Sequence, residues 1–334
     1  MSVGEALARA IEKKDRRALA QAITLVESAQ PAHRADADAL MAHLKSPPET
    51  AFRIGITGPP GAGKSTLIEA MGQRLIAEGH RLAVLTIDPS SRISGGSILG
   101  DKTRMPTLSA DPKAFVRPSP SSGIEGGVSR HTQEAILLCE ACGFDRVLVE
   151  TVGVGQSELR VAQMTDVFVL LLAPSAGDEL QGIKRGVMEL ADVILINKSD
   201  GDLRAAAQRA AAECLASTGL MKTQTPDWTV PVLNISALEG DGIAQALSEL
   251  ERFHQHLKDR GLIDLRRRHQ ASEALTTSIQ EALYDAATGD PNLNRELDQV
   301  RKLVLSGNLT PRLAAARFVD QFTARMGKSN DRTT

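Results

Sequence analysis

Two short motifs in different parts of the chain carry residue types that bind a nucleoside triphosphate. The first has the P-loop pattern G-x-x-x-x-G-K-[ST] and consists of Gly58, Pro59, Pro60, Gly61, Ala62, Gly63, Lys64 and Ser65. Its glycines let backbone N–H groups surround phosphate oxygens, the lysine can reach the β- and γ-phosphates, and the serine can ligate Mg²⁺. Residues 51–57 predict a buried strand before the loop, and the run from Thr66 predicts a helix whose N-terminus favours anions.

The second motif selects the base. It has the pattern N-K-x-D and consists of Asn197, Lys198, Ser199 and Asp200. A carboxylate at its last position can accept hydrogen bonds from the ring N–H and the exocyclic amine of guanine, whereas adenine offers no such donor pair. The motif follows the apolar run 193–196, where a parallel strand should deliver a ligand-binding loop. A further segment after the final predicted strand is similar to the loop that closes over guanine through a backbone N–H: Ser236, Ala237 and Leu238. We therefore predict a site for GTP or GDP with Mg²⁺.

Several acidic residues are candidates for the metal and for hydrolysis. Glu150 begins E-T-V-G at the end of a predicted strand, where GTPases keep D-x-x-G. An acid there can hold Mg²⁺ through water, and the Gly153 N–H can bond the γ-phosphate. Glutamate here departs from the aspartate of the common pattern, and its longer side chain changes how far the carboxylate reaches. Asp88 and Asp101 can also reach the metal, although the first can be a turn residue and the second a solvated loop charge. The predicted metal ligands are Ser65, Asp88, Asp101 and Glu150, and the predicted catalytic residues are Lys64, Asp101, Glu150 and Gly153.

The residue after Gly153 is Val154, not the glutamine that orients the attacking water in Ras-like enzymes. Gln156 lies three residues beyond the glycine. We therefore expect slow intrinsic hydrolysis that a partner accelerates, as in a switch. A scaffold that binds nucleotide without turnover remains an alternative.

Composition narrows the remaining classes. The 334 residues have a formal net charge of −2, no basic stripe, and only one Trp and one Tyr, which argues against nucleic-acid binding. The apolar runs are strand-sized, too short to cross a membrane. The N-terminus carries Glu5 and Glu12 and lacks a signal-peptide core, so we expect a cytoplasmic protein.

Cys139 and Cys142 have C-x-x-C spacing. The apolar residues before them predict a helix that ends at Gly143, and small apolar residues on such a helix usually pack. Zinc needs about four ligands, and only Cys214 and scattered histidines could complete a site. Metal binding is therefore the less favoured interpretation.

The chain is organised around an alternation of apolar strands and helices. We predict an N-terminal helical extension over 1–46, a P-loop domain over 47–255, and a C-terminal helical arm over 256–334 that forms a homodimer. The predicted strands are 53–57, 82–88, 115–117, 146–150, 167–173, 193–197 and 232–236. Continuous apolar runs are typical of parallel strands buried on both faces, so the fold class is α/β with a doubly wound, mostly parallel sheet.

Longer blocks of sequence carry a family resemblance. They are D-P-S-S at 88–91, G-G-S-I-L-G-D-K-T-R-M at 95–105, R-P-S-P-S-S-G at 117–123, E-T-V-G-V-G-Q-S at 150–157 and G-D-E-L-Q-G-I-K at 177–184. Over residues 45–245 the chain closely resembles MeaB-type, methylmalonyl-CoA mutase-associated GTPases of the metallochaperone group, a family also labelled ArgK or LAO/AO transport ATPase.

The resemblance implies a G-protein chaperone for an adenosylcobalamin-dependent acyl-CoA mutase. Such a protein gates delivery of the cofactor from the adenosyltransferase and protects or reactivates the mutase, to which the adenosylcobalamin belongs. It also implies that the matches to Asp101 and Glu150 lie near Mg²⁺, with Asp88 close by. A further implied switch signals between mutase and nucleotide through Asp178, Glu179, Gln181 and Lys184. The alternative interpretation of that segment is an ordinary helix start with an acidic first turn.

Two other functions have to be weighed: a nickel metallochaperone GTPase, and a kinase or transport-linked ATPase. Nickel metallochaperone GTPases share such a core but usually carry a His-rich tract, whereas the seven histidines here are scattered. His254 and His256 are expected on a solvated helix face. Asn197 and Asp200 argue against a kinase or a transport-linked ATPase. The sequence leaves methylmalonyl-CoA, ethylmalonyl-CoA and isobutyryl-CoA mutases open as partners.

Overall fold

The computed structural model describes residues 1–28, 30–45, 50–88, 105–120, 127–151, 157–174, 185–219, 221 and 223–330. The chain divides into two compact units, Met1–Ala271 and Ser272–Thr334.

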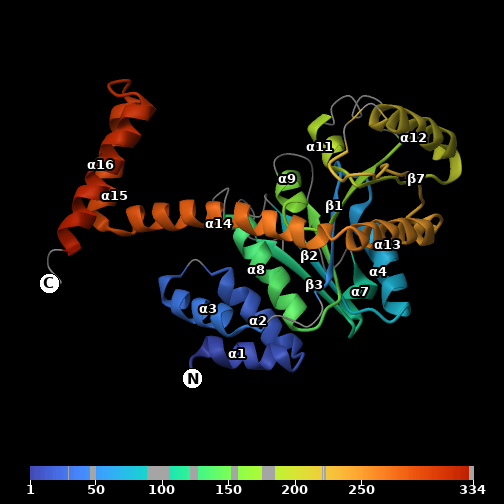
Figure 1. The fold of residues 1–334 in the computed structure, drawn as a ribbon, viewed down its shortest axis with the longest axis horizontal. Helices are drawn as coiled ribbons and strands as arrows, with labels where there is room; N and C mark the ends of the chain where they lie inside the picture. Colours follow the sequence, from blue (N-terminus) through green and yellow to red (C-terminus); the bar gives the residue numbers. More distant parts are fainter. Residues whose placement is uncertain are drawn as a thin grey trace. The chain divides into compact units, whose positions relative to one another are not determined.

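Unit 1 is built on a sheet whose seven described strands are all parallel (Figure 1). They are β1 (Phe52–Thr57), β2 (Leu82–Asp88), β3 (Ala114–Pro120), β4 (Arg146–Thr151), β5 (Val167–Leu172), β6 (Val193–Ile196) and β7 (Val232–Asn234). Their order is β3-β2-β4-β1-β5-β6-β7, so the chain winds outward in both directions from the centre. The predicted doubly wound α/β fold is confirmed. The carboxyl ends of the strands meet at one edge, where ligands bind in such sheets.

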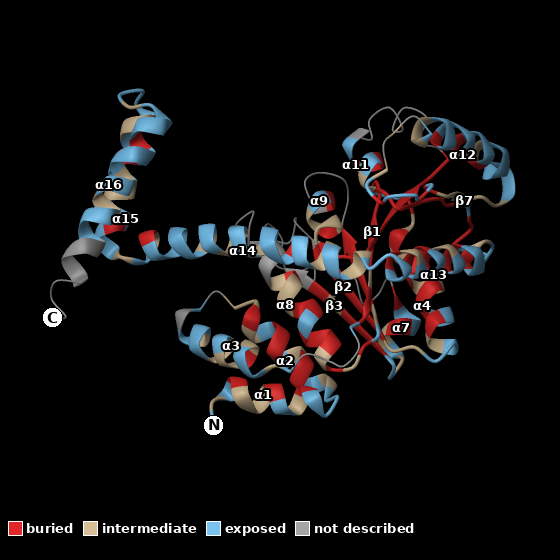
Figure 2. Cartoon of the chain, viewed as in Figure 1, coloured by how far each residue is buried: buried red, intermediate tan, exposed pale blue. Residues whose placement is uncertain are grey.

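Helices cover both faces of this sheet and bury its apolar strands (Figure 2). They are α4 (Lys64–Ala77), α7 (Pro106–Ala110), α8 (Gly127–Ala141), α9 (Ser157–Ala162), α11 (Arg185–Leu190), α12 (Arg204–Thr218) and α13 (Ile243–Asp259), with the 3-10 turn η1 (Gly201–Leu203). Helix α8 ends as predicted, because Gly143 has a φ of +82° and the Phe144 N–H donates to the Cys139 carbonyl at 3.1 Å.

The N-terminal extension belongs to unit 1. It consists of α1 (Val3–Glu12), α2 (Arg16–Val26) and α3 (Pro31–His43). Leu19 and Ile23 of α2 are fully buried, and α2 packs on α8. The Arg117 Nη2 atom of β3 lies 2.6 Å from Glu27 Oε2, at the end of α2. Apolar packing and this ion pair therefore join the extension to the edge of the sheet.

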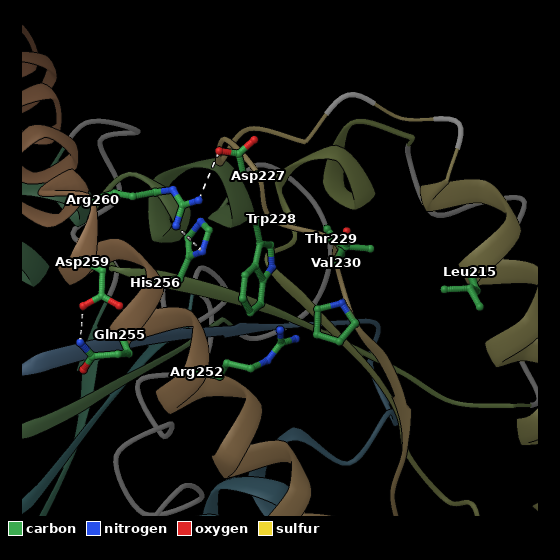
Figure 3. A pocket seen from close by; sticks show the side chains of 11 residues that line it. Leu215, Asp227, Trp228, Thr229, Val230, Arg252, Gln255, His256, Asp259 and Arg260 are labelled. Carbon is green, nitrogen blue, oxygen red and sulfur yellow. Dashed lines mark hydrogen bonds and ion pairs between the residues drawn. The ribbon is translucent and has the colours of Figure 1, made fainter.

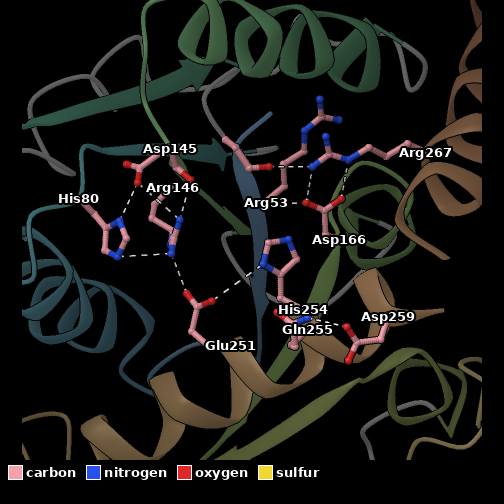
Figure 4. Close-up of polar contacts among 11 residues, drawn as sticks. Arg53, His80, Asp145, Arg146, Asp166, Glu251, His254, Gln255, Asp259 and Arg267 are labelled. Atoms are coloured by element: carbon pink, nitrogen blue, oxygen red, sulfur yellow. Dashed lines mark hydrogen bonds and ion pairs between the residues drawn. The ribbon is translucent and has the colours of Figure 1, made fainter. Parts of the chain in front are cut away.

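The first turns of α14 (Leu262–Gly289) are also held on unit 1. Arg267 forms an ion pair with Asp166 at 2.6 Å, and Arg266 forms one with Asp192 at 3.2 Å. Figure 4 shows Asp166 between Arg53 and Arg267. Because the two aspartates directly precede β5 and β6, these pairs fix the first turns of α14, which belong to unit 1, to the amino edge of the sheet. The division between the units accordingly follows Ala271, whereas the sequence places the start of the arm at residue 256.

Unit 2 contains the rest of α14, α15 (Pro291–Leu305) and α16 (Pro311–Asn330). Helix α16 begins at Pro311, and its first turn is closed by the Ala314 N–H, which donates to the Thr310 carbonyl at 2.9 Å. Leu293, Val300 and Ala314 form the buried centre of the unit. In the described part of the chain, every helix is too short or too polar to span a bilayer.

Candidate nucleotide site

The P-loop connects β1 to α4 and encloses the side chain of Lys64. The lysine is buried, and its Nζ donates to the carbonyl oxygens of Gly58 at 2.8 Å and Pro59 at 3.1 Å. A Cβ on Gly58 would come within 2.1 Å of the Leu171 carbonyl oxygen, so only glycine allows the loop to leave β1 this close to β5. The loop therefore holds a cationic side chain at the N-terminus of α4, at the carboxyl edge of the sheet.

Asn197 links the two predicted nucleotide motifs to the loop after β7. Its Nδ2 donates to the Ala62 carbonyl at 2.8 Å, and its Oδ1 accepts from the Ala237 N–H at 2.9 Å. The side chain is only 2% exposed. One buried amide thus fixes the P-loop, N-K-x-D and S-A-L segments relative to one another.

Asp200 lies at the more open side of this cluster. The Ser236 hydroxyl donates to its Oδ2 and accepts from the Glu239 N–H at 3.1 Å. The Ser199 N–H donates to the Ile235 carbonyl at 3.0 Å, which anchors the segment beside β7. Leu238 is 82% exposed at the tip of its turn. The carboxylate is therefore oriented while the adjoining loop stays open to solvent.

The candidate metal ligands meet at the ends of β1 and β4. The Ser65 hydroxyl donates to Glu150 Oε1 at 3.2 Å, and Glu150 is 3% exposed. A hydroxyl and a buried carboxylate in contact are hard oxygen donors of the kind Mg²⁺ prefers, so these residues fit that ion. Asp101, Gly153, Asp178, Glu179, Gln181 and Lys184 lie outside the described residues, as does the side chain of Asp88. The structure therefore brings together Ser65 and Glu150 of the predicted metal ligands.

The sequence interpretation missed a buried hydroxyl pair next to these ligands. Thr57 Oγ1 and Thr151 Oγ1 lie 2.8 Å apart, and both residues are fully buried. The available signal was strand register: Thr57 ends the predicted strand 53–57, Thr151 directly follows the predicted strand 146–150, and β1 and β4 are neighbours in the sheet.

Other candidate sites have structural explanations. Cys139 and Cys142 are buried in the core, and burial raises the pKa of both thiols. In the part of the chain described, His, Cys, Asp and Glu side chains form no metal-binding cluster. The expected solvated position is wrong for His254, whose ring is buried and stacks on Phe52 with centroids 4.0 Å apart.

A cavity of about 640 Å³ lies apart from the nucleotide motifs, between α13 and the segment before β7 (Figure 3). Its charged side chains are paired: Arg260 lies 3.3 Å from Asp227, and Gln255 donates to Asp259 at 2.6 Å. Arg252 lies over the Trp228 ring at 4.4 Å from its centroid. The cavity lies at the amino end of β7, away from the nucleotide motifs.

A parallel sheet with a P-loop after β1 and N-K-x-D after β6 defines the class of P-loop GTPases. A family model described as methylmalonyl Co-A mutase-associated GTPase MeaB matches residues 19–292, and the chain belongs to this family. The predicted family and GTPase activity are thereby confirmed.

Curated relatives agree with this assignment. A probable GTPase of Mycobacterium tuberculosis (strain H37Rv) is 48% identical, covering 95% of this chain and 94% of the relative. A mitochondrial methylmalonic aciduria type A homolog of Mus musculus is 45% identical, covering 94% of this chain and 78% of the relative. GTPase ArgK of Escherichia coli (strain K12) is 43% identical, covering 91% and 92%. A crystal structure of a LAO/AO transport system kinase has a TM-score of 0.74 at 35% identity, covering 95% and 97%.

Proposed function

We propose that this GTPase is a nucleotide-controlled chaperone of an adenosylcobalamin-dependent acyl-CoA mutase. In this role it gates cofactor loading and protects or reactivates the mutase, with methylmalonyl-CoA mutase as the first candidate partner. Two findings support the proposal: the family is named for association with that mutase, and the mouse relative is named for methylmalonic aciduria. The observation that carries the GTP specificity is the Asn197–Asp200 segment, oriented beside the P-loop.

The P-loop and the segments around it bind the nucleotide. Lys64 moves its ammonium from two neutral carbonyl oxygens to the charged β- and γ-phosphate oxygens, which are stronger acceptors. Asp200 accepts from the guanine edge, and the Ala237 backbone closes over the base together with Ser236 and Leu238. The remaining proposed donors are the loop N–H groups of Gly58, Gly61, Ala62, Gly63, Ser65 and Thr66, and Lys198. Pro59 and Pro60 have no N–H, so they line the nucleotide without donating to it.

Ser65 and Glu150 would hold Mg²⁺, with Asp88 and Asp101 as further ligands proposed from the sequence. The ion would supply positive charge that neutralises the phosphate oxygens. The chain has Val154 where Ras-like enzymes place their glutamine, so it orients the attacking water poorly by itself. Hydrolysis is therefore slow until the mutase docks, and residues Asp178 to Lys184 relay that docking to the nucleotide.

Unit 2 joins two copies of the chain, with the cobalamin adenosyltransferase as a further transient partner. Leu275, Ile279 and Leu283 lie on one face of α14 and are each at least half exposed. The same unit carries an apolar groove of about 610 Å³ between α14, α15 and α16, lined by Phe318 and Phe322 among others. Because Leu283 of the stripe also lines the groove, the two form one apolar surface, which a second copy can cover with the same surface of its own.

The dimer has its own test. Ile279→Glu should convert the dimer to a monomer in light scattering after size exclusion, because it places a charge in an apolar interface. Gln280→Glu, an exposed neighbour on the same helix, is the control and should remain dimeric. A monomeric wild-type protein would remove this part of the proposal.

A transport-linked kinase is the second candidate, because the LAO/AO protein carries that name. A metallochaperone for another metalloenzyme is the third. Turnover with ATP as fast as with GTP would favour the kinase. Failure to bind any acyl-CoA mutase, with GTP specificity intact, would favour the metallochaperone.

The chaperone role is tested by cofactor loading. Cofactor-free methylmalonyl-CoA mutase is mixed with the purified protein and adenosylcobalamin under GDP, GTP or a non-hydrolysable analogue, and loading is followed by absorbance. We expect loading to depend on the nucleotide, and Lys64→Ala to remove that dependence. Equal loading under all nucleotides, and without nucleotide, would contradict the proposal.

A further inference from the structure

We propose that the Thr57–Thr151 hydroxyl pair positions the Glu150 carboxylate against the P-loop for GTP hydrolysis. This inference rests on the proposed role of Glu150 as a metal ligand. The two Oγ1 atoms lie 2.8 Å apart and both residues are 0% exposed. Thr57 directly precedes Gly58, the first residue of the P-loop, and Thr151 directly follows Glu150. The pair thus joins the two chain segments whose separation sets the metal site.

Strand register shows how the pair works. Ile56 of β1 is paired with Glu150 of β4, so Thr57 lies opposite Thr151 one residue further on. Successive side chains of a strand point to opposite faces, so the Glu150 and Thr151 side chains leave the sheet on different sides. Glu150 meets the Ser65 hydroxyl of α4 on its side.

The hydroxyl pair lies on the side covered by α9. Gly55 shares this face with Thr57, and a Cβ on Gly55 would come within 2.6 Å of Val161 and 2.7 Å of Thr165, which lie in α9 and just after it. The end of β4 is therefore held on both faces, to α4 by Ser65–Glu150 and to the end of β1 by Thr57–Thr151. This arrangement limits both tilt and separation of the two strand ends.

The position of the pair in the sheet indicates that the hydroxyls align the ends of β1 and β4 and do not only fill space in the core. The register between β1 and β4 extends to Ile56 and Glu150 and no further. One residue further on, the Thr57 and Thr151 hydroxyls lie in hydrogen-bond contact between β1 and β4. Valine has nearly the same shape as threonine, so packing alone does not require hydroxyls here. A directed hydrogen bond adds a fixed distance at the point where the two loops begin.

Enzymes catalyse phosphoryl transfer mainly by positioning the reacting groups and the metal. A small displacement of Glu150 should therefore slow hydrolysis. Residues that orient a metal ligand without touching the metal typically change affinity or activity by ~10–100-fold when removed. Thr57 and Thr151 are positioning residues in this sense. Their loss should affect turnover and Mg²⁺ dependence more than binding of the base.

The test uses Thr57→Val, Thr151→Val and the double variant in the full-length protein. Each single variant should lower single-turnover hydrolysis of GTP about 10-fold and raise the Mg²⁺ concentration for half-maximal rate. GDP affinity in EDTA should change less than about twofold, since no P-loop or base contact is removed. Thr57→Ser keeps a hydroxyl and should retain wild-type turnover.

The melting temperature distinguishes a role of the threonine pair in aligning the site from a role in packing alone. Single variants should lower the melting temperature, whereas the double variant should regain it, because replacing both partners of a buried hydrogen bond by apolar groups of the same shape can be nearly neutral. Turnover of the double variant should stay low. Recovery of turnover together with the melting temperature would overturn the inference and assign the pair a structural role only, as would wild-type turnover of both single variants.

Two controls complete the design. Thr225→Val removes a buried hydroxyl that bonds Asp192 at the amino edge of the sheet, and should lower the melting temperature without changing turnover. Glu150→Gln tests the proposed function itself. If Glu150→Gln retains Mg²⁺-dependent turnover, the metal assignment fails; if only the threonine variants retain it, the positioning inference alone fails.

Discussion

Asn197 lies so close to Gly63 that a Cβ on the glycine would come within 2.4 Å of the Asn197 Nδ2 atom. That nitrogen donates to Ala62 in the P-loop, and the Oδ1 of the same amide accepts from Ala237. A change on one side of this contact therefore displaces an amide that three nucleotide-binding segments share.

Gly63→Ala should weaken GDP binding by about 10-fold or more, because losing a buried hydrogen bond and misplacing the segments costs ~1–3 kcal/mol. The residue has a φ of +93°, so backbone strain adds to the clash. Isothermal titration measures the loss. Gly79→Ala is the matched control: its φ is +103° but no atom lies within 4 Å of the added Cβ. It should lower stability and leave GDP affinity unchanged. Equal affinity of both variants would show that the contact does not matter.

Asp200→Asn should weaken GTP binding and shift preference toward xanthosine nucleotides. The new amide presents a donor to the exocyclic amine of guanine, whereas xanthine carries an oxygen there. The expected loss is roughly 1.5–3 kcal/mol, the typical value for hydrogen bonds to a charged group. Competition between GTP and XTP measures the shift. Unchanged GTP affinity would remove Asp200 from the base site.

Lys64→Ala should abolish hydrolysis, because the ammonium offsets charge on the β- and γ-phosphoryl oxygens. In the described structure this cation already lies within the loop, bonded to Gly58 and Pro59. Single-turnover assays with radiolabelled GTP give the rate. Normal turnover by the folded variant would show that the P-loop assignment is wrong.

Gln181→Ala and Lys184→Ala should leave GTP affinity and basal turnover nearly intact. What should fall is the stimulation by the mutase, by roughly fivefold or more, since coupling between sites is typically ~1–3 kcal/mol. The two residues are three apart, so they share a face if the segment is helical. Stimulation equal to that of wild type in both variants would leave the segment as an ordinary helix start.

The ionisation of Glu251 should make the free energy of unfolding depend on pH in the acid range. The His254 ring, with Nδ1 3.9 Å from Oε2, and the Arg146 guanidinium, which donates to Oε1 at 2.8 Å, lower the pKa of Glu251 to about 2 (Figure 4). The distance to His254 is long for a hydrogen bond, so Arg146 is the firmer contact.

Because the pKa of Glu251 is lower in the folded protein than in the unfolded chain, where it is near 4.3, its ionised form stabilises the fold at pH values above 4.3. This stabilisation is lost as the pH falls from 4.3 toward 2. Glu251→Gln should therefore lower stability at pH 7 by ~0.2–1 kcal/mol, as for an exposed pair, and the difference should vanish near pH 2. Urea unfolding across this range measures it. A difference independent of pH would contradict the assignment.

The sequence predicted the sheet well because its strands are continuous apolar runs, as at 146–150 and 193–197. It underestimated β3, which extends to Pro120, because two prolines argue against a strand interior. Here β3 is an edge strand, where proline is tolerated.

The features that could not be predicted from the sequence depend on contacts between residues far apart in the chain. Nothing local in the sequence pairs Arg267 with Asp166, so the attachment of the first turns of α14 to unit 1 could not be predicted from it. The stacking of His254 on Phe52 joins residues far apart in the chain, and a charged local pattern concealed its burial. The nucleotide segments were predictable because short motifs fix both residue type and spacing, whereas the Thr57–Thr151 pair depends on which strands become neighbours.

Control of GTP hydrolysis by the mutase is tested most directly by measuring the hydrolysis rate as methylmalonyl-CoA mutase is titrated into the purified protein. We expect slow turnover alone and a saturable increase, since a group supplied by a partner can be worth ~10³ or more in rate in other GTPases. The increase should vanish in Lys64→Ala. Fast turnover by the isolated protein, or a rate that no acyl-CoA mutase changes, would contradict the account.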